Sequence, residues 1–161
     1  MQKNTPFLWF DDQAEEAADF YVSLFKNSKI NGVSRYENEE SANLSGKPLG
    51  SVMVVHFELD GQTFTALNGG PHFKFTEAIS FVVNCETQDE VDFFWENLGA
   101  GGTPGQCGWL KDRYGVSWQI VPTVMDELMS GDTEKAKRVM GAMLRMTKIE
   151  IKGLQAAYEI A

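Results

Sequence analysis

FLWFDD at residues 7–12, followed by EAADFY at residues 16–21, recurs without gaps 73 positions later as SFVVNC (residues 80–85) followed by DEVDFF (residues 89–94). Each copy has the pattern of a strand that leads into an amphipathic helix. A repeated strand-helix unit restricts the fold more than composition does, because two copies must pack together to complete one hydrophobic core. The repeat therefore predicts two related modules.

Hydrophobic spacing and turn signals extend the first copy into module one, residues 5–70. The expected elements are a strand at 5–10, a helix at 13–25, a strand at 28–37, an exposed loop at 38–50, and strands at 52–59 and 62–67. The last two strands meet at Asp60-Gly61, a dipeptide that accepts the positive φ of a tight hairpin turn. The first half of the chain is therefore predicted to be β-α-β-β-β.

Module two, residues 76–122, repeats this order. We expect a strand at 78–85, a helix that ends at Leu98, a turn-rich connection at 99–105, and hairpin strands at 109–113 and 116–121. Thr87 and Glu90 have the spacing of a capping box at the start of that helix. A helical tail, residues 123–161, is expected to contain helices at 124–129, after a cap at Asp132, and at 149–158. We expect a single α+β domain that spans residues 1–161.

The charge balance limits the class of partner. The formal net charge is −9, with 14 Lys and Arg against 23 Asp and Glu. Binding to a phosphate backbone requires clustered cations, so we expect no nucleic-acid partner. No apolar run approaches the ~20 residues of a membrane span, and the N-terminus lacks the apolar core of a signal peptide. We therefore expect a cytoplasmic protein with no membrane partner.

The two cysteines, Cys85 and Cys107, are too few for a disulfide framework and lack the spacing of a structural zinc site. We interpret both as reduced thiols. Cys85 fits the pattern of a buried strand residue. Cys107 lies in a glycine-rich stretch, and its role stays open.

Several longer segments resemble the PhnB-like branch of the vicinal oxygen chelate superfamily, which includes glyoxalase I, bleomycin-resistance proteins and extradiol dioxygenases. The segments that carry the resemblance are FLWF at 7–10, DGQ at 60–62, ALNGGPHF at 66–73 and GWLKDRYGVSWQIVP at 108–122. The resemblance covers residues 5–144. It implies a glyoxalase-like fold in which two curved-sheet modules form a cup, and it implies a homodimer that binds a small organic molecule.

The resemblance also implies where a metal is held in that superfamily, on the first and fourth strands of each module. Those positions correspond here to Pro6 and Thr65 in module one and to Ile79 and Gln119 in module two. None of the four supplies the imidazole or carboxylate that a divalent cation prefers. We therefore expect neither a metal nor a cofactor in the cup.

The PhnB-like branch is often labelled 3-demethylubiquinone-9 3-methyltransferase. A typical S-adenosylmethionine-dependent enzyme has a parallel α/β sheet with a Gly-rich turn after its first strand. The first predicted strand here ends in Phe10-Asp11-Asp12-Gln13, without such a turn. We therefore treat the label as nomenclature rather than as an activity.

Strand alternation sorts the site candidates by face. If Thr65 and Gln119 face the cup, then Phe64, Ala66, Trp118 and Ile120 pack beneath the helices, and His56 and Glu58 become a strand-borne acid-base pair. His72 lies in the loop between the modules, and Trp109 and Phe73 are placed to stack on a planar ligand. The candidate catalytic residues are His56, Glu58 and His72, and the candidate ligand-binding residues are Thr65, Leu67, Trp109, Ser117 and Gln119.

Three functional interpretations follow. The first is a protein that binds a small molecule without a metal, in the manner of bleomycin-resistance proteins. The second is an enzyme in which His56 with Glu58, or His72, transfers a proton and Gln119 donates a hydrogen bond to a substrate oxygen. The third is a metal-dependent lyase or dioxygenase with a shifted set of ligands.

Overall fold

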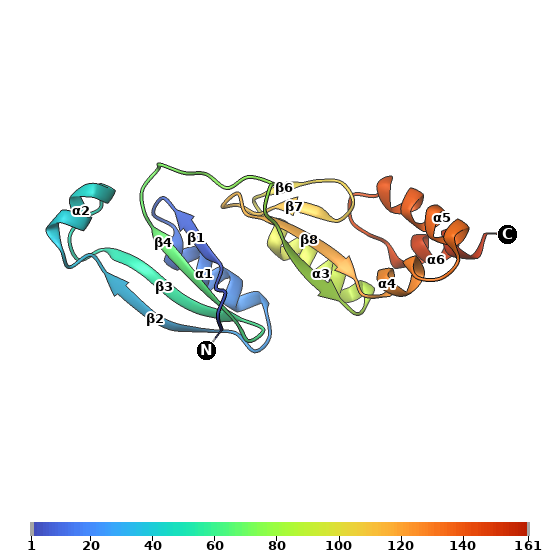
Figure 1. Cartoon of the computed structure of the whole chain (residues 1–161), viewed down its shortest axis with the longest axis horizontal. Coiled ribbons are helices and arrows are strands. Elements are labelled where there is room, and N and C mark those ends of the chain that lie inside the picture. Colours follow the sequence, from blue (N-terminus) through green and yellow to red (C-terminus); the bar gives the residue numbers. More distant parts are fainter. Residues whose placement is uncertain (1, 161) are drawn as a thin grey trace. The chain divides into compact units, whose positions relative to one another are not determined.

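A computed structural model describes residues 2–160, which divide into two compact units, one ending at Phe75 and the other beginning at Thr76. Each unit contains a four-stranded mixed sheet (Figure 1). In each sheet the first strand lies parallel to the last one, and the remaining pairs are antiparallel. The repeated α+β module and the C-terminal helices are thereby confirmed.

The first unit has the sheet order β1-β4-β3-β2. Its elements are β1 (Phe7–Phe10), α1 (Ala14–Leu24), β2 (Lys29–Arg35), α2 (Glu39–Ser45), β3 (Val52–Leu59) and β4 (Gln62–Asn68). The hairpin between β3 and β4 turns at Asp60 (φ 49°) and Gly61 (φ 80°), as the sequence predicts.

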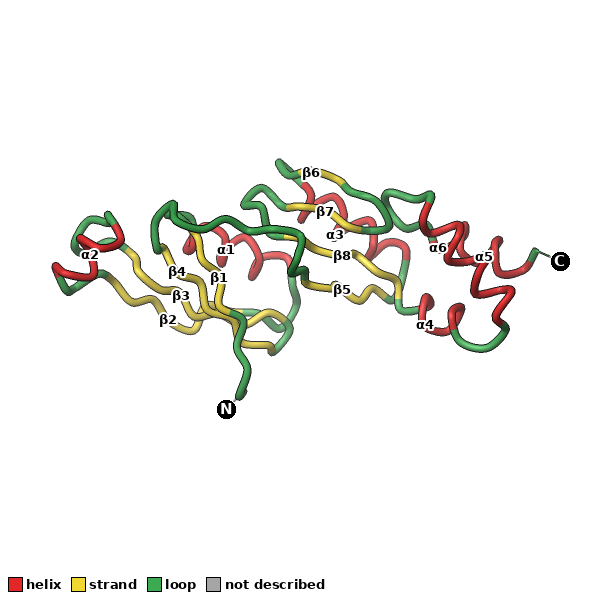
Figure 2. The backbone as a smooth tube through the Cα atoms, turned by 45° about the horizontal axis from the view of Figure 1, so that its top comes forward, coloured by secondary structure: helices red, strands yellow, loops and turns green. Residues whose placement is uncertain are grey.

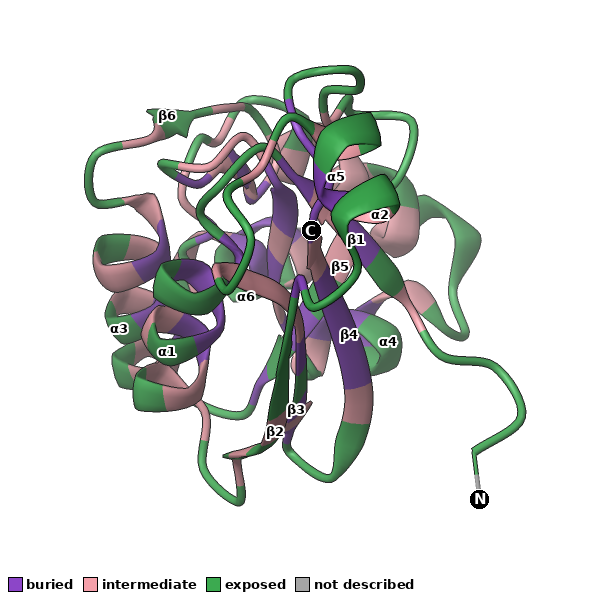
Figure 3. Cartoon of the chain, turned by 90° about the vertical axis from the view of Figure 1, so that its left-hand side faces the viewer, coloured by how far each residue is buried: buried purple, intermediate pink, exposed green. Residues whose placement is uncertain are grey.

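One face of this sheet forms the core beneath α1. The buried side of α1 consists of small residues and one aromatic ring: Ala14, Ala17, Ala18 and Tyr21. Tyr21 stacks on Phe57, and Phe57 stacks on Phe64, with ring centroids 6.4 and 5.4 Å apart. Figure 3 shows the buried positions along β4 and on the inward side of α1. The predicted inward orientation of Phe64 and Ala66 is confirmed, since they are 4% and 0% exposed.

The expected loop at residues 38–50 contains the short helix α2. Asn38 caps it by accepting a hydrogen bond from the Ser41 N–H, and Gly46 ends it with φ 67°. These are ordinary start and stop signals. The polar composition of the segment outweighed them in the sequence-based prediction, so this element was missed.

The second unit has the sheet order β5-β8-β7-β6. Its sheet elements and covering helix are β5 (Phe81–Cys85), α3 (Gln88–Gly99), β6 (Thr103–Pro104), β7 (Trp109–Lys111) and β8 (Ser117–Pro122). The strand expected from residue 78 begins only at Phe81. Thr87 caps α3 through the Glu90 N–H at 3.2 Å, as expected, although the Glu90 carboxylate accepts from the Glu86 N–H instead of reaching back to Thr87.

The turn-rich connection at residues 99–105 includes the two-residue edge strand β6. A Cβ on Gly102 would lie 2.0 Å from the Lys111 carbonyl oxygen, and one on Gly105 would lie 2.9 Å from that of Trp109. Glycine is thus required for β6 to approach β7. A strand of this length carries no alternation pattern, which explains why it was not predicted.

The tail forms the three predicted helices, α4 (Val124–Met129), α5 (Thr133–Leu144) and α6 (Ile151–Glu159), with Asp132 capping α5 (Figure 2). They share a core that consists of Met125, Leu128, Val139, Ile149 and Leu154. Met143 and Met146 pack against this core.

The tail is fastened to the rest of the second unit by hydrogen bonds. The Gln88 side chain donates to the Ile149 carbonyl at 3.1 Å and accepts from the Ile151 N–H at 2.8 Å. The N–H groups of Cys107 and Gly108 donate to the carbonyls of Met146 and Thr147. The tail is therefore built into this unit and is not a loose extension.

No helix among residues 2–160 is long and apolar enough to cross a membrane.

We predict that Gln88→Ala destabilises the second unit, because it leaves a part-buried carbonyl and N–H without their partner. The expected loss is about 1–3 kcal/mol in the free energy of unfolding, measured by urea denaturation, with faster proteolysis of the tail. Gln62→Ala, at an exposed position on β4, is the matched control. Equal stability of the two variants would contradict this assignment.

A second prediction concerns pH. The pKa of Asp92 is lowered by hydrogen bonds from Lys148 and Gln88, and the Lys148 ammonium lies 2.7 Å from its carboxylate. A lowered folded-state pKa stabilises the fold above the unfolded pKa, and this contribution is lost as pH falls through the folded pKa. Asp92→Asn should therefore be less stable than the parent at pH 7, and the difference should shrink as the pH falls below about 4, the ordinary pKa of an aspartate. A difference in melting temperature that is as large at pH 3 as at pH 7 would argue against it.

Candidate functional site

The face of the first sheet opposite α1, which we call its helix-free face, brings His56 and Thr65 together. They are paired across β3 and β4, and His56 Nδ1 lies 3.3 Å from Thr65 Oγ1. Phe7 on β1 is paired with Thr65 from the other side and is 59% exposed. This row therefore places an imidazole, a hydroxyl and an accessible aromatic ring side by side.

Glu58 shares this face but pairs with a different residue. Its carboxylate lies 3.5 Å from the Lys29 ammonium, on the neighbouring strand β2. No hydrogen bond joins Glu58 to His56 in the described part of the chain. The structure therefore does not bring the two together as an imidazole with an orienting carboxylate.

Leu67 lies in the next row, between Val54 and Trp9. The Trp9 indole N–H donates to the Gly70 carbonyl at 2.9 Å, and a Cβ on Gly69 would lie 2.3 Å from the indole ring. In the Asn-Gly-Gly-Pro-His segment, Gly69 thus leaves room for the Trp9 ring against the backbone, and Gly70 accepts its hydrogen bond.

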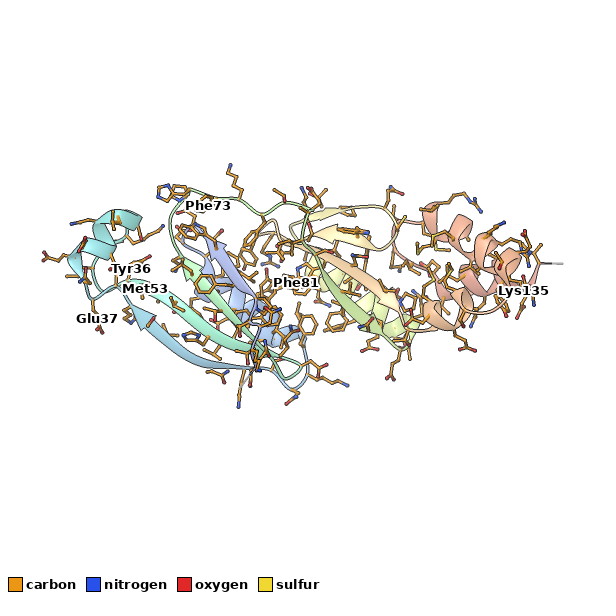
Figure 4. The ribbon with its side chains drawn as sticks, in the orientation of Figure 1. Tyr36, Glu37, Met53, Phe73, Phe81 and Lys135 are labelled. Carbon is orange, nitrogen blue, oxygen red and sulfur yellow. The ribbon has the colours of Figure 1, made fainter. Side chains whose placement is uncertain are left out.

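Phe73 and His72 surround Trp9 on the loop that follows β4. The Phe73 ring (labelled in Figure 4) meets Trp9 edge-on with centroids 4.9 Å apart. The His72 ring also meets Trp9 edge-on, with centroids 6.5 Å apart. Phe73 is 65% exposed. We call Trp9, His72 and Phe73 the aromatic ledge. It offers an accessible apolar surface, and within residues 2–160 no hydrogen bond links its histidine to His56.

Asn68 holds this end of the module in place. Its side-chain oxygen accepts the Ala14 N–H at the start of α1, its amide donates to the Val52 carbonyl, and its own carbonyl accepts the Tyr36 hydroxyl. Asn68 is 6% exposed. These hydrogen bonds explain why an asparagine occupies the first position of the Asn-Gly-Gly-Pro-His segment.

The helix-free face of the second sheet carries Ser117 and Gln119 on β8. Gln119 donates to the Ser80 hydroxyl at 2.9 Å and is flanked by Val82 and Trp109. Ser117 is paired with Lys111, which is held by the Glu77 carboxylate. Ser117 is 1% exposed, and its hydroxyl has no hydrogen-bond partner among residues 2–160. A buried hydroxyl without a partner is unusual and requires an explanation.

Asp112 is a key residue of the β7–β8 turn that the sequence analysis did not single out. Its buried carboxylate accepts hydrogen bonds from the backbone N–H groups of Tyr114 and Val116 and from the Trp118 indole at 2.9 Å. These contacts fix the turn and pull Trp118 into the core. An aspartate three residues before Gly115 was the available signal, because such residues favour tight turns.

Comparison with known proteins shows the family of this chain. A family model described as 3-demethylubiquinone-9 3-methyltransferase matches residues 2–121. The chain belongs to this family. A PhnB protein from Bacillus cereus, itself described as a putative 3-demethylubiquinone-9 3-methyltransferase, is 37% identical and superposes with a TM-score of 0.67 over 76% of this chain and 100% of its own. The predicted PhnB-like membership is confirmed.

More distant solved structures share the fold alone. Protein PA1353 from Pseudomonas aeruginosa is 17% identical, with a TM-score of 0.56 over 76% of this chain and 98% of its own. The fosfomycin resistance protein FosX from Listeria monocytogenes, solved with Mn(II) and sulfate, is 15% identical, with a TM-score of 0.50 over 84% and 96%. No functionally curated protein matches the chain.

The metal positions implied by the superfamily can be compared with the strand register of this PhnB-like chain. Beside Thr65 the register places Phe7 rather than Pro6, and beside Gln119 it places Val82 rather than Ile79. Hydroxyl and amide side chains are weak neutral ligands for a divalent cation. Among residues 2–160, no group of three or more His, Cys, Asp or Glu has the geometry to hold a metal ion. These residues therefore do not fit a metal, and we derive no chemistry through one.

The two cysteines of this PhnB-like chain differ in environment. Cys85 is fully buried on β5, and burial raises the pKa of its thiol to about 12. Cys107 is partly exposed and has φ 58°, in the left-handed region. Its backbone supports the tail, so the residue has a structural place in the fold.

We predict that only Cys107 reacts with a thiol reagent in the folded protein at pH 8, because the thiolate is the nucleophile and Cys85 is both buried and protonated. Titration with a chromogenic disulfide reagent should therefore release one equivalent per chain, and Cys107→Ser should abolish it. Urea should restore the reaction of Cys85. Two rapid equivalents in the native state would refute this distinction.

Proposed function

We propose that this PhnB-like protein binds a small organic molecule on the helix-free face of its second sheet, with Ser117 and Gln119 as the polar contacts. The observation that carries this proposal is the buried Ser117 hydroxyl without a partner. Leaving such a group unsatisfied costs about 1–3 kcal/mol. A ligand oxygen or N–H beside Ser117 offsets that cost only while it is bound.

The neighbours of Ser117 support a ligand that is polar at one end and apolar at the other. The Gln119 amide nitrogen is engaged by Ser80, and its carbonyl oxygen has no partner among residues 2–160. The Trp109 and Val82 side chains lie on either side of Gln119, and Val82 is 51% exposed. Apolar walls around a few aimed polar groups are typical of small-molecule sites. A planar molecule that carries a carbonyl or hydroxyl group fits these contacts.

Binding without chemistry is favoured over proton transfer. The carboxylate expected to orient His56 pairs with Lys29 instead, so the imidazole has the neutral Thr65 hydroxyl as its side-chain partner. His72 belongs to the aromatic ledge and packs on Trp9. We therefore assign no proton transfer to His56 or His72. Homodimer formation and a cytoplasmic location stay predictions.

The test begins with a fragment library of planar aromatic carbonyl compounds, screened by ligand-observed NMR. Ser117→Ala should weaken the best fragments about tenfold, the loss of one hydrogen bond of ~1.4 kcal/mol, and should leave the free protein as stable as the parent or more stable. Gln119→Ala should weaken them similarly. Ser34→Ala, at an exposed position on β2, is the control. Fragments that bind both site variants as tightly as the parent would refute the proposal.

Catalysis is tested with the same fragments. We expect each bound fragment to be recovered unaltered after long incubation, with an affinity that is unchanged in His56→Ala and His72→Ala. A fragment that is converted by the parent protein, but not by one of these histidine variants, would establish the enzyme alternative instead.

A further inference from the structure

The tail, which lies outside the residues matched by the family model, contains a groove between α5 and the end of α6. Its volume is about 380 Å³. The lining residues are Glu134, Lys137, Arg138, Gly141, Arg145, Ala157 and Ile160. Four of these residues lie on α5 and Arg145 is its C-cap, and each lies three or four positions from another, so together they form one stripe along the helix. The groove is therefore a surface of α5 that the packing of α6 leaves open.

Arg145 is directed into this groove. It is the C-cap residue of α5, where a cation is expected to lie near the last carbonyl groups of the helix. Its guanidinium instead folds back over the preceding turn, with Nη1 3.7 Å from the position of a Cβ on Gly141. It forms no hydrogen bond or ion pair within residues 2–160. A guanidinium has five donors, so this side chain is available to an anion.

Gly141 has no evident structural requirement. A glycine inside a helix is unfavourable relative to alanine. The backbone here is helical, and a Cβ would meet only the flexible tip of Arg145 at an ordinary contact distance. Without a side chain at residue 141, the Arg145 guanidinium has room to lie over this turn of the helix.

The charges of the groove do not cancel. Glu134 is paired with Lys137 at 3.1 Å, which leaves the two arginines without an acidic partner in the groove. Arg138 donates from Nε and Nη2 to the carbonyls of Ala157 and Tyr158, which holds its guanidinium in place at the end of α6. Lys135 also joins α5 to this end of α6, because its ammonium lies 4.7 Å from the centre of the Tyr158 ring.

The tail differs from the rest of the chain in its net charge, which is zero and so does not repel an anion. Residues 123–161 contain six basic and six acidic residues, so the whole net charge of −9 lies in residues 1–122. A local excess of two guanidinium groups stands out against that background. It indicates a specific contact and not a general attraction for anions.

We propose that this groove binds the phosphate monoester group of a small organic molecule. A phosphate monoester carries nearly two negative charges on one group at pH 7 and has three acceptor oxygens, which matches two arginines that face one groove. Ala157 and Ile160 supply apolar surface for the organic part. The site is separate from Ser117 and Gln119 and does not depend on the function proposed for them.

The probe is phenyl phosphate, titrated into the full chain at pH 7.5 and followed by calorimetry and backbone amide NMR. We expect saturable binding with the shifted resonances on α5 and α6. Arg145→Gln should weaken it at least about tenfold, as the loss of a charge-assisted hydrogen bond requires. Gly141→Ala should also weaken it while raising the melting temperature, a combination that misfolding does not produce. Lys152→Gln, an exposed cation of α6 outside the groove, should bind like the parent.

Comparison probes test the ligand class. Benzoate, which carries one charge, should bind more weakly, and phenyl phosphate should lose affinity as pH falls through about 6, its second pKa. The proposal is overturned by absent binding, by unchanged affinity in Arg145→Gln, by shifts confined to β5–β8, or by equal affinity for benzoate. It is also overturned if only vesicles that contain phosphatidate bind, or if Arg145→Gln alters only self-association in analytical ultracentrifugation.

Discussion

The parallel pairing of the first and last strands of each module determines most of this structure. In each module the chain returns so that the last strand lies beside the first and runs in the same direction. The helix that follows the first strand is thereby confined to one face of the sheet. That face becomes the core, where Phe57, Phe64 and Trp118 are buried. The opposite face is left without a helix. The candidate site residues Thr65 and Gln119 lie on this opposite face because of how each sheet is paired.

How much of this follows from the sequence depends on the range of the interaction. Asp60-Gly61, Thr87 and Asp132 were interpreted correctly because their signals are local, and strand alternation placed His56 on the proper face. Alternation gives no information about partners across strands, however. Glu58 meets Lys29 through a β2–β3 pairing whose register shifts between Ile30 and Gly32. The sequence shows neither that shift nor the packing that buries Ser117.

The two modules have diverged around the same plan. At the end of the first sheet, the Asn68 side chain joins α1, β3 and the Tyr36 hydroxyl, and glycines make room for Trp9. In the second module, Asp112 fastens the turn before β8, and Gln88 on α3 fastens a tail that the first module lacks. One sheet thus ends in an exposed aromatic surface, whereas the other unit is extended by a helical layer with its own core and its own groove.

The contact between Trp9 and Gly69 has a consequence for how relatives are to be sorted. The indole ring occupies the volume that any side chain at residue 69 would need. An alanine or serine there would push the ring off the backbone and separate it from Phe73 and His72. Glycine at residue 69 is therefore a requirement of this aromatic surface: a relative with any larger residue there cannot hold a tryptophan ring in this position against the backbone, however similar the rest of the chain.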